Sequence, residues 1–459
     1  MKWRKATAMS LAGVMAASVM SVGGVSTVFA ADGVKYADIK LGEDTDTKAD
    51  IKLITNRTDM LDSDYSGKNW DVYLKEFNDM YPDIKVEIEG VTDYAQDSLL
   101  RLQGGDWGDI MMIPEVDKSD LSTYFLSYGD VDSVKKEVKY PNRWLYENEV
   151  YGIPITVVGR GVLYNKKVFK EAGITELPKT PDEFITDLKA VKDKTDAIPL
   201  YTNYAAGWTM GAWDDYTGIT ATGDAKYRNQ EFAHTKDPFS DPGDGTGAYN
   251  VYKILYDAVA DGLTEDDYST TDWESSKGML NNGQIATMVL GSWAYPQMQG
   301  AGDNADDIGY FAFPITVDGK QYSPADEDYC FGINANSDET NQKAAMIFVK
   351  WMTEKSGYSY NEGGLPIAVG DDKLPEVYQE FTDNNVEFIS NEPAIEGEED
   401  VLNELNADSE LMVGAGGNEK IQAIVEHASN GDEDFDDIMK EWNEKWSDAQ
   451  DTDDVEVNE

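Results

Sequence analysis

Tryptophan and tyrosine side chains stand close to carboxylates in several predicted loops of this sequence. Trp293 and Tyr295 follow a predicted strand that ends at Gly291-Ser292, and Trp213 directly precedes Asp214-Asp215. The chain contains 11 Trp and 26 Tyr, more than a core requires. Flat rings can stack on the apolar C–H face of a sugar, and carboxylates can accept hydrogen bonds from its hydroxyls. These positions predict a site for a hydroxyl-rich ring, with a place in the core as the alternative for each aromatic.

A second group of polar side chains follows the first predicted strand, residues 51–55. Asn56, Arg57, Thr58 and Asp59 form the break after it. Loops at the carboxyl ends of parallel strands are the usual binding surface of an open α/β sheet. We therefore expect Arg57 and Asp59 to hydrogen-bond ligand hydroxyls, with a solvated turn as the alternative.

The sequence predicts no metal and no cofactor. One cysteine, Cys330, and two histidines, His234 and His427, argue against a Cys- or His-based metal centre. No glycine-rich nucleotide-binding motif is present. Residues 237–245 offer oxygen atoms that suit calcium but lack the spacing of an EF-hand loop, so a turn-rich loop is favoured and calcium binding there stays open.

The charge balance excludes some classes of partner. The 459 residues include 38 Lys+Arg and 88 Asp+Glu, which gives a formal net charge of -50. Such a chain argues against nucleic acid and against anionic membrane surfaces, because both need clustered cations. A neutral or cationic small ligand is compatible with it. The length and a hydrophobic content of 41% predict two or three domains with sizeable cores.

The first 30 residues are predicted to be a cleaved export signal. Lys2, Arg4 and Lys5 form a basic start, residues 6–31 carry no charge, and small residues surround a cleavage site after Ala30. A retained membrane anchor is the alternative, but many Ser, Gly and Thr residues dilute the hydrophobicity of this stretch. No cysteine follows the signal, which excludes lipid attachment there. We expect the mature protein in the periplasm or at the cell surface.

The order of predicted elements is typical of an α/β fold. A first block alternates strands at 51–55, 85–89 and 109–113 with helices at 70–81 and 94–104. A second block holds strands at 161–164, 198–201, 284–290 and 309–313, helices over 184–191 and 251–258, and a helix capped by Ser337. Thr180-Pro181 with Glu183 predicts the start of the first helix of this block, since it combines an N-cap, a proline in the first turn and a glutamate three residues on. Residues 203–250 show no clear periodicity.

Several short motifs occur in the order that one known family shows. They are Tyr81-Pro82-Asp83-Ile84-Lys85-Val86, Gly105-Asp106-Trp107-Gly108-Asp109-Ile110, Tyr151-Gly152-Ile153-Pro154, Leu163-Tyr164-Asn165-Lys166-Lys167-Val168-Phe169, Pro178-Lys179-Thr180-Pro181-Asp182-Glu183, Asn282-Gly283-Gln284-Ile285-Ala286-Thr287-Met288 with Gly291-Ser292-Trp293-Ala294, and Phe331-Gly332-Ile333-Asn334. With these motifs the chain resembles the extracellular solute-binding proteins of ABC importers, in the sugar-binding family that includes maltose-binding protein.

The resemblance implies a two-lobed α/β fold of the periplasmic-binding-protein type. Each lobe would be a mainly parallel sheet flanked by helices, with the ligand in the cleft and hinge crossings near 155–156, 326–328 and 372–375. The expected divisions are a signal peptide (1–30), a flexible lead-in (31–49), a first lobe (50–154 with 329–374), a second lobe (155–328 with 375–450) and an acidic tail (451–459).

The resemblance also implies positions for the ligand. Trp293 and Trp208 match aromatics that stack sugars in the family, Glu115 and Asp117 follow the strand where the family places polar contacts, and Tyr329 lies beside the second crossing. Ile113 replaces the family's aromatic at that strand. The full set of expected ligand-binding residues is Arg57, Asp59, Glu115, Asp117, Trp208, Trp213, Trp293, Tyr295 and Tyr329.

The resemblance makes the protein a binding component rather than an enzyme. It would capture a sugar or short oligosaccharide as a monomer and deliver it to the transmembrane subunits of an ABC permease. Two alternatives use the same residue types. A secreted glycoside hydrolase would place two carboxylates about 5–9 Å apart across the scissile bond. A binding protein for a cation such as a polyamine would use an aromatic box with carboxylates.

Overall fold

The computed structural model describes residues 33–65, 67–92, 94–414 and 417–458. The expected signal peptide, residues 1–30, lies outside the described residues. Within the described part of the chain, no helix has the length and apolarity that a membrane crossing requires. The arrangement below concerns the compact unit that begins at Val34.

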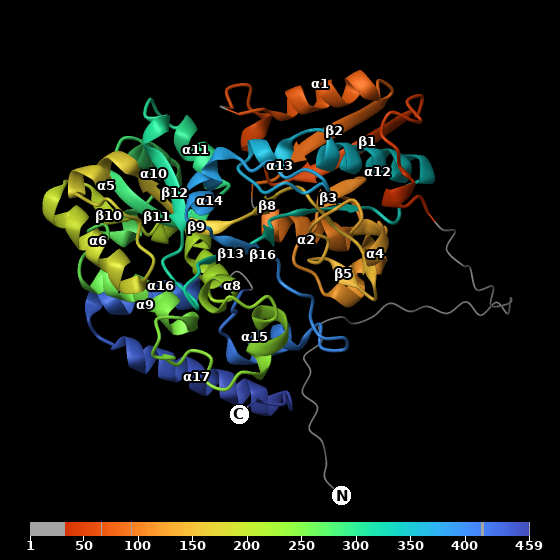
Figure 1. Cartoon of the computed structure of the whole chain (residues 1–459). Helices are drawn as coiled ribbons and strands as arrows, with labels where there is room; N and C mark the ends of the chain where they lie inside the picture. Colours follow the sequence, from red (N-terminus) through yellow and green to blue (C-terminus); the bar gives the residue numbers. More distant parts are fainter. Residues whose placement is uncertain (1–32, 66, 93, 415–416, 459) are drawn as a thin grey trace, which may run out of the picture. The chain divides into compact units, whose positions relative to one another are not determined.

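The first sheet has five strands in the order β2-β1-β3-β15-β7. Their bounds are β1 (Ala49–Thr55), β2 (Ile84–Gly90), β3 (Ile110–Met112), β7 (Ile153–Pro154) and β15 (Cys330–Ile333). Helices α1 (Trp70–Met80), α2 (Tyr94–Gly104) and α12 (Glu339–Glu354) belong to this half, and α1 and α12 lie against the sheet (Figure 1). The strands and helices predicted from residues 51–113 are confirmed.

The second sheet has four strands in the order β10-β11-β9-β12. Their bounds are β9 (Arg160–Asn165), β10 (Ile198–Leu200), β11 (Ile285–Gly291) and β12 (Ile308–Ala312). The helices around it are α5 (Lys166–Ala172), α6 (Pro181–Lys194), α10 (Trp273–Asn281) and α11 (Ala294–Gly300) (Figure 1). The predicted two-lobed α/β class is thereby confirmed.

Each sheet is parallel apart from one inverted strand. In the first sheet β15 runs antiparallel to both β3 and β7, and in the second β9 runs antiparallel to both β11 and β12. Each inverted strand is the one by which the chain enters that sheet from the other. Two crossing segments, β8 (Val157–Val158) and β14 (Asp326–Glu327), pair antiparallel between the sheets. The two sheets are therefore connected by a short two-stranded ladder.

Alternate residues of the second sheet face two different cores, as the period of a strand requires. Leu163, Leu290 and Tyr310 pack in one cluster with the first sheet. Val162 and Phe311 face the other cluster, which includes residues of four longer helices. These helices are α9 (Gly247–Ala260), α15 (Val401–Ser409), α16 (Glu419–Asn430) and α17 (Phe435–Thr452).

The remaining elements are short. The helices are α3 (Leu121–Tyr124), α4 (Val131–Val134), α7 (Trp208–Gly211), α8 (Ile219–Thr222), α13 (Tyr358–Asn361) and α14 (Gln379–Asp383), with the 3₁₀ turn η5 (Ala212–Tyr216). The strands are β4 (Gly129–Asp130), β5 (Leu145–Tyr146), β6 (Glu149–Val150), β13 (Tyr322–Pro324) and β16 (Glu387–Ile389). Residues 203–250, which showed no periodicity, form several of these single turns before α9.

Of the two predicted helix N-caps, Thr180 is confirmed, and Ser337 lies one residue before the residue that caps its helix. Thr180 caps α6 by accepting a hydrogen bond from the Glu183 amide at 3.3 Å, as expected. The cap of α12 is Asp338, which accepts from two amides of the first turn, and not Ser337. The Ser337 hydroxyl instead donates to Asp109 at 2.7 Å, because the chain has not yet turned into the helix at that residue.

Both ends of the described chain make long-range contacts, although the sequence predicted a flexible lead-in. The expected flexible lead-in contains Tyr36, which is fully buried, donates its amide to the Tyr128 carbonyl and accepts from the Lys350 ammonium. At the other end, the Asn458 amide donates to the His234 carbonyl at 2.7 Å. Long-range contacts therefore hold two segments whose own sequences carry no strong pattern.

Candidate ligand-binding site

A cavity of about 640 Å³ lies where the two sheets meet. From the first sheet come Asn56 and Arg57, which follow β1, together with Tyr358 and Glu362 of the α13 region. The crossing segments contribute further residues, and the second half contributes α7, η5 and the end of β11. Residues of both halves therefore face one cavity. Its lining also includes Ile155, Thr156, Arg160, Trp208, Asp215, Trp293, Gln297, Asp328, Tyr329 and Asn418.

Tryptophan rings form the wall on the side of the second sheet. The ring centroids of Trp208 and Trp293 lie 5.6 Å apart, and Trp273 lies 5.2 Å from Trp208 and 5.7 Å from Trp293. Trp208 is 42% exposed. Gly291 allows this arrangement, since a Cβ there would come within 2.7 Å of the Trp293 ring. The three rings are inclined to one another by 51–82° and form an apolar cluster, of which Trp208 and Trp293 line the cavity.

Arg57 is held by the residues around it. Its Nε and Nη2 donate to Asp59 at 2.9 Å, its Nη1 donates to Glu362 at 2.8 Å and to Tyr358 at 3.1 Å, and its Nη2 also donates to Tyr65 at 2.8 Å. A guanidinium has five N–H groups. All of them are therefore used within the protein, and Arg57 positions the cavity wall.

Asp59 belongs to this cluster and does not line the cavity. Burial tends to raise its pKa, but the hydrogen bond and the charge of Arg57 outweigh burial and hold the pKa below its usual value. The carboxylate is therefore ionised and paired with Arg57.

A second cluster of charges lies at the crossing. Arg160, at the start of β9, contacts Asp215 at 3.1 Å and Asp326 at 3.4 Å, and Arg228 lies 3.7 Å from Asp215. The Arg160 amide donates to the Ser323 hydroxyl at 2.8 Å. Half-buried opposite charges of this kind fix side-chain positions, because an unpaired partner would be costly. The cluster joins η5 and the crossing segments to the second sheet.

Tyr329 is the fourth sequence-predicted residue that lines the cavity, with Arg57, Trp208 and Trp293. Its ring meets Tyr94 edge to face at a centroid distance of 5.6 Å. Burial raises the pKa of Tyr329 to about 12, so its hydroxyl is neutral and can donate or accept. The structure thus brings together four of the nine expected residues.

Two of the expected aromatics are core residues. Trp213 is 2% exposed and packs on Phe313 at a centroid distance of 5.9 Å. Tyr295 is 5% exposed and its hydroxyl accepts from Gln299. In η5, with three residues per turn, positions two apart point in different directions. Asp215 faces the cavity, and Trp213 consequently faces the core.

The two expected carboxylates after β3 lie outside the cavity. Glu115 is exposed and forms an ion pair with Arg143 at 2.7 Å. Asp117 is exposed at the N-terminus of a 3₁₀ turn, Lys118–Asp120. The sequence reasoning in turn gave no role to Asp328 and Glu362. The signal for Asp328 was its place in an expected crossing, next to Tyr329, whereas nothing in the sequence pointed to Glu362.

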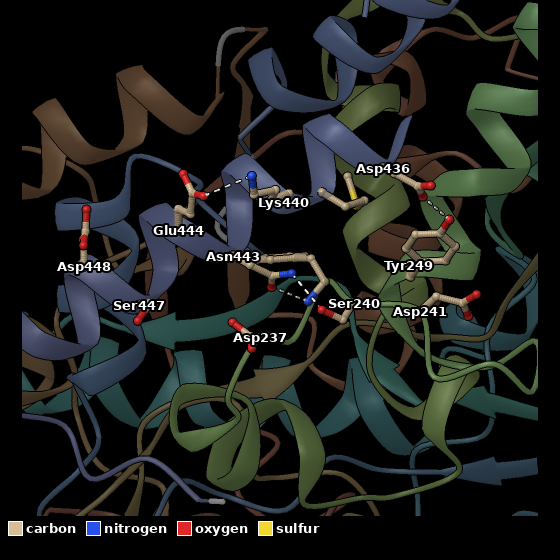
Figure 2. A pocket seen from close by; sticks show the side chains of 12 residues that line it. Asp237, Ser240, Asp241, Tyr249, Asp436, Lys440, Asn443, Glu444, Ser447 and Asp448 are labelled. Atoms are coloured by element: carbon tan, nitrogen blue, oxygen red, sulfur yellow. Dashed lines mark hydrogen bonds and ion pairs between the residues drawn. The ribbon is translucent and has the colours of Figure 1, made fainter. Parts of the chain in front are cut away.

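The loop with calcium-friendly oxygens borders a different, more open hollow (Figure 2). Its polar side chains largely pair with each other. Tyr249 donates to Asp436 at 2.6 Å, and Asn443 accepts from the Phe239 amide and donates to Ser240 at 3.0 Å. Among the described residues, no group of three or more His, Cys, Asp or Glu side chains is placed to hold a metal ion. The cavity between the sheets differs from this hollow in drawing its aromatic and charged lining from both halves of the protein.

The crossing should make stability depend on pH through Glu327. Burial raises the pKa of Glu327 to about 7, and the charge of Asp326 adds to this while Arg143 opposes it. Between the usual carboxyl pKa and about 7, the unfolded chain releases this proton while the folded chain keeps it, so stability falls as pH rises through that window. Glu327→Gln should therefore raise the free energy of unfolding by about 1–3 kcal/mol at about pH 8 and much less at about pH 5. Urea unfolding of both proteins at the two pH values measures this, and an equal effect at both would contradict it.

Known proteins that are similar to this chain are solute-binding proteins. The pattern of the family described as "Bacterial extracellular solute-binding protein" matches residues 62–358. The multiple sugar-binding protein of Streptococcus mutans is 27% identical over 307 residues, which are 64% of this chain and 71% of that protein.

Two similar solved structures come from Bifidobacterium animalis subsp. lactis. One is a manno-oligosaccharide specific solute binding protein in complex with mannotriose, 56% identical, with a TM-score of 0.88 over 92% of this chain and 99% of that one. The other is the binding protein of an ABC transporter in complex with mannobiose, 54% identical, with the same TM-score and coverage.

Proposed function

This chain belongs to the bacterial extracellular solute-binding proteins, and from that premise we propose that it captures a manno-oligosaccharide in the cavity between its two sheets. The bound sugar is then handed to the transmembrane subunits of an ABC importer. The observation that carries the proposal is the 56% identity, over 92% of the chain, to a protein whose structure contains mannotriose. The tryptophan wall and the hydroxyl-accepting carboxylates of the cavity suit such a ligand.

Titration calorimetry with purified protein tests the proposal. Mannobiose and mannotriose should bind and should raise the melting temperature, because a ligand that binds only the folded state stabilises it. Maltotriose and a galactose-based trisaccharide of the same length serve as controls and should bind much more weakly. Absence of binding to every mannose-containing oligosaccharide, with a folded protein, would overturn the proposal.

The protein does no chemistry on its ligand under this proposal. The family and the similar structures are binding proteins. A glycoside hydrolase would need one carboxyl held as a general acid beside a second carboxylate. In the cavity, Asp215 is instead paired with Arg160. Prolonged incubation with mannotriose should release no mannose, and the appearance of shorter products would favour the hydrolase.

Binding of a cationic solute is the second candidate function, and the same titrations test it. The cavity holds carboxylates beside aromatic rings, which is also the composition of a cation-binding box. Affinity for a polyamine would fall steeply with added salt, whereas affinity for a neutral sugar would not. Spermidine is therefore included in the calorimetric series at low and high salt.

The protein acts outside the cytoplasm, as its family does. We place it in the periplasm or at the cell surface after removal of the predicted signal. A lipid anchor on the chain's one cysteine is not part of the proposal, because Cys330 is buried in β15. Fractionation of cells that express the full chain tests this location.

Ligand should make the protein more compact. Residues of both halves line the cavity, so the closed arrangement gains contacts with the ligand that the open one lacks, and this difference in affinity shifts the population. Small-angle scattering should show a smaller radius of gyration with saturating mannotriose than without it. The non-binding trisaccharide is the control, and an unchanged radius with bound mannotriose would contradict the expectation.

A further inference from the structure

The charged residues that line the cavity are paired within the protein, with one exception. Arg57 and Glu362 contact each other at 2.8 Å, and Arg160 contacts Asp215 at 3.1 Å. The fifth charged residue of the lining is Asp328, between β14 and β15. Its carboxylate makes no hydrogen bond or ion pair with any residue that the structure describes. The cavity therefore carries one unmatched negative charge.

The backbone of Asp328 is fixed although its carboxylate is not paired. Its amide donates to the Thr156 carbonyl at 3.1 Å, and its own carbonyl accepts from Arg143 Nη1 at 2.7 Å. The first bond ties Asp328 to the other crossing segment, and the second ties it to Arg143, which precedes β5. The backbone from which the carboxylate projects is thus held by Thr156 and Arg143.

The cations nearest to Asp328 are already used by other carboxylates. Arg160 pairs with Asp215 and Asp326, and Arg143 pairs with Glu115. Burial raises the pKa of Asp328, and the charges of Arg160 and Arg143 only partly oppose this. A half-buried carboxylate without a partner is costly until a donor reaches it.

We propose that Asp328 accepts hydrogen bonds from ligand hydroxyls and makes the cavity select neutral oligosaccharides against acidic ones. A carboxylate has only acceptor sites, so it complements hydroxyl donors and repels another carboxylate. A sugar that carries a uronic acid at this point would meet a like charge inside the cavity. This inference rests on the proposed function and adds to it a specificity-determining residue.

The test compares the unmodified protein with Asp328→Asn and Asp328→Ala by titration calorimetry. Loss of a hydrogen bond to a charged acceptor should weaken mannobiose binding by about 10- to 100-fold in Asp328→Ala, and less in Asp328→Asn. The matched control is Asp193→Asn, which removes the same charge from an exposed position on α6. It should bind mannobiose as the unmodified protein does.

The second probe is the same disaccharide with its non-reducing end oxidised to the uronic acid. The unmodified protein should prefer mannobiose to this acid by at least about 10-fold, and Asp328→Asn should lose most of that preference. Equal binding of the two sugars by the unmodified protein would overturn the inference, and this measurement needs no variant to fold. A preference that Asp328→Asn keeps in full would overturn it as well.

The outcomes separate this inference from the proposed function. If the unmodified protein binds mannobiose and the Asp328 variants bind both sugars unchanged, only the inference is wrong. If the unmodified, folded protein binds no mannose-containing oligosaccharide, the proposed function is wrong and the inference falls with it.

Discussion

Replacing Trp293 with alanine should weaken the binding of mannotriose by about 30- to 1000-fold, the range expected when a central aromatic contact is lost. Trp293 lies two residues past the end of β11 and lines the cavity. Its ring packs beside Trp208 and Trp273 and leaves a face for the ligand. Removing the ring removes stacking area and also loosens the rest of the wall. Titration calorimetry measures the affinity.

Trp293→Tyr should keep much of the affinity, because a smaller flat ring still offers a stacking face. The free energy of unfolding without ligand should fall by less than about 2 kcal/mol in Trp293→Ala, because the side chain is only half-buried. Trp213→Ala is the matched control. Trp213 is a core residue, so the same substitution there should cost about 3–5 kcal/mol of stability. Unchanged affinity in Trp293→Ala together with a large loss of stability would overturn the assignment.

Replacing Arg57 with methionine should lower the free energy of unfolding by about 3–5 kcal/mol, because it leaves a buried carboxylate without its partner. The side chain of Glu362 is only 4% exposed, and its carboxylate forms an ion pair with the Arg57 guanidinium through Nη1. Tyr65 donates to the same Glu362 oxygen at 2.8 Å, but a neutral hydroxyl does not replace a charge. Urea unfolding without ligand measures the effect.

The double variant Arg57→Met/Glu362→Gln should recover at least half of that loss, since no buried charge is then left alone. Lys445→Met is the surface control. Lys445 pairs with Glu441 at 2.8 Å on the exposed face of α17, and such pairs contribute less than about 1 kcal/mol. If Arg57→Met costs no more than Lys445→Met, the cluster around Arg57 does not stabilise the first half of the protein.

Elements with a strong local pattern could be predicted from the sequence. The helix at Pro181 combines a cap, a proline and a regular apolar stripe, and the structure has it where expected. The anchoring of Tyr36 could not be predicted in the same way. It depends on Tyr128 and Lys350, which are far away in the sequence and carry no local signal.

Only part of the site could be predicted, because some of its features also depend on contacts between residues far apart in the sequence. Residue type and a nearby strand end located Trp208 and Trp293, which line the cavity. The direction of a side chain in an irregular turn depends on tertiary packing. For this reason the sequence could not show that Trp213 points into the core while Asp215 points into the cavity. Whether a charge is paired is also a property of the folded chain. For that reason Asp328 stood out only once Arg160 and Arg143 were seen with their partners.

The place of β15 within the first sheet has a consequence for how the protein is made. β15 lies between β3 and β7, yet roughly 220 residues separate it from β3, and a ribosome adds them in about 10–40 s at roughly 5–20 residues per second. The strands of the second sheet are all synthesised within this interval. During it, the apolar strand β3 has no neighbour for the backbone groups of that edge. An unpaired apolar edge is where nascent chains stick to one another, so the newly made protein is most vulnerable to aggregation until Cys330–Ile333 emerges.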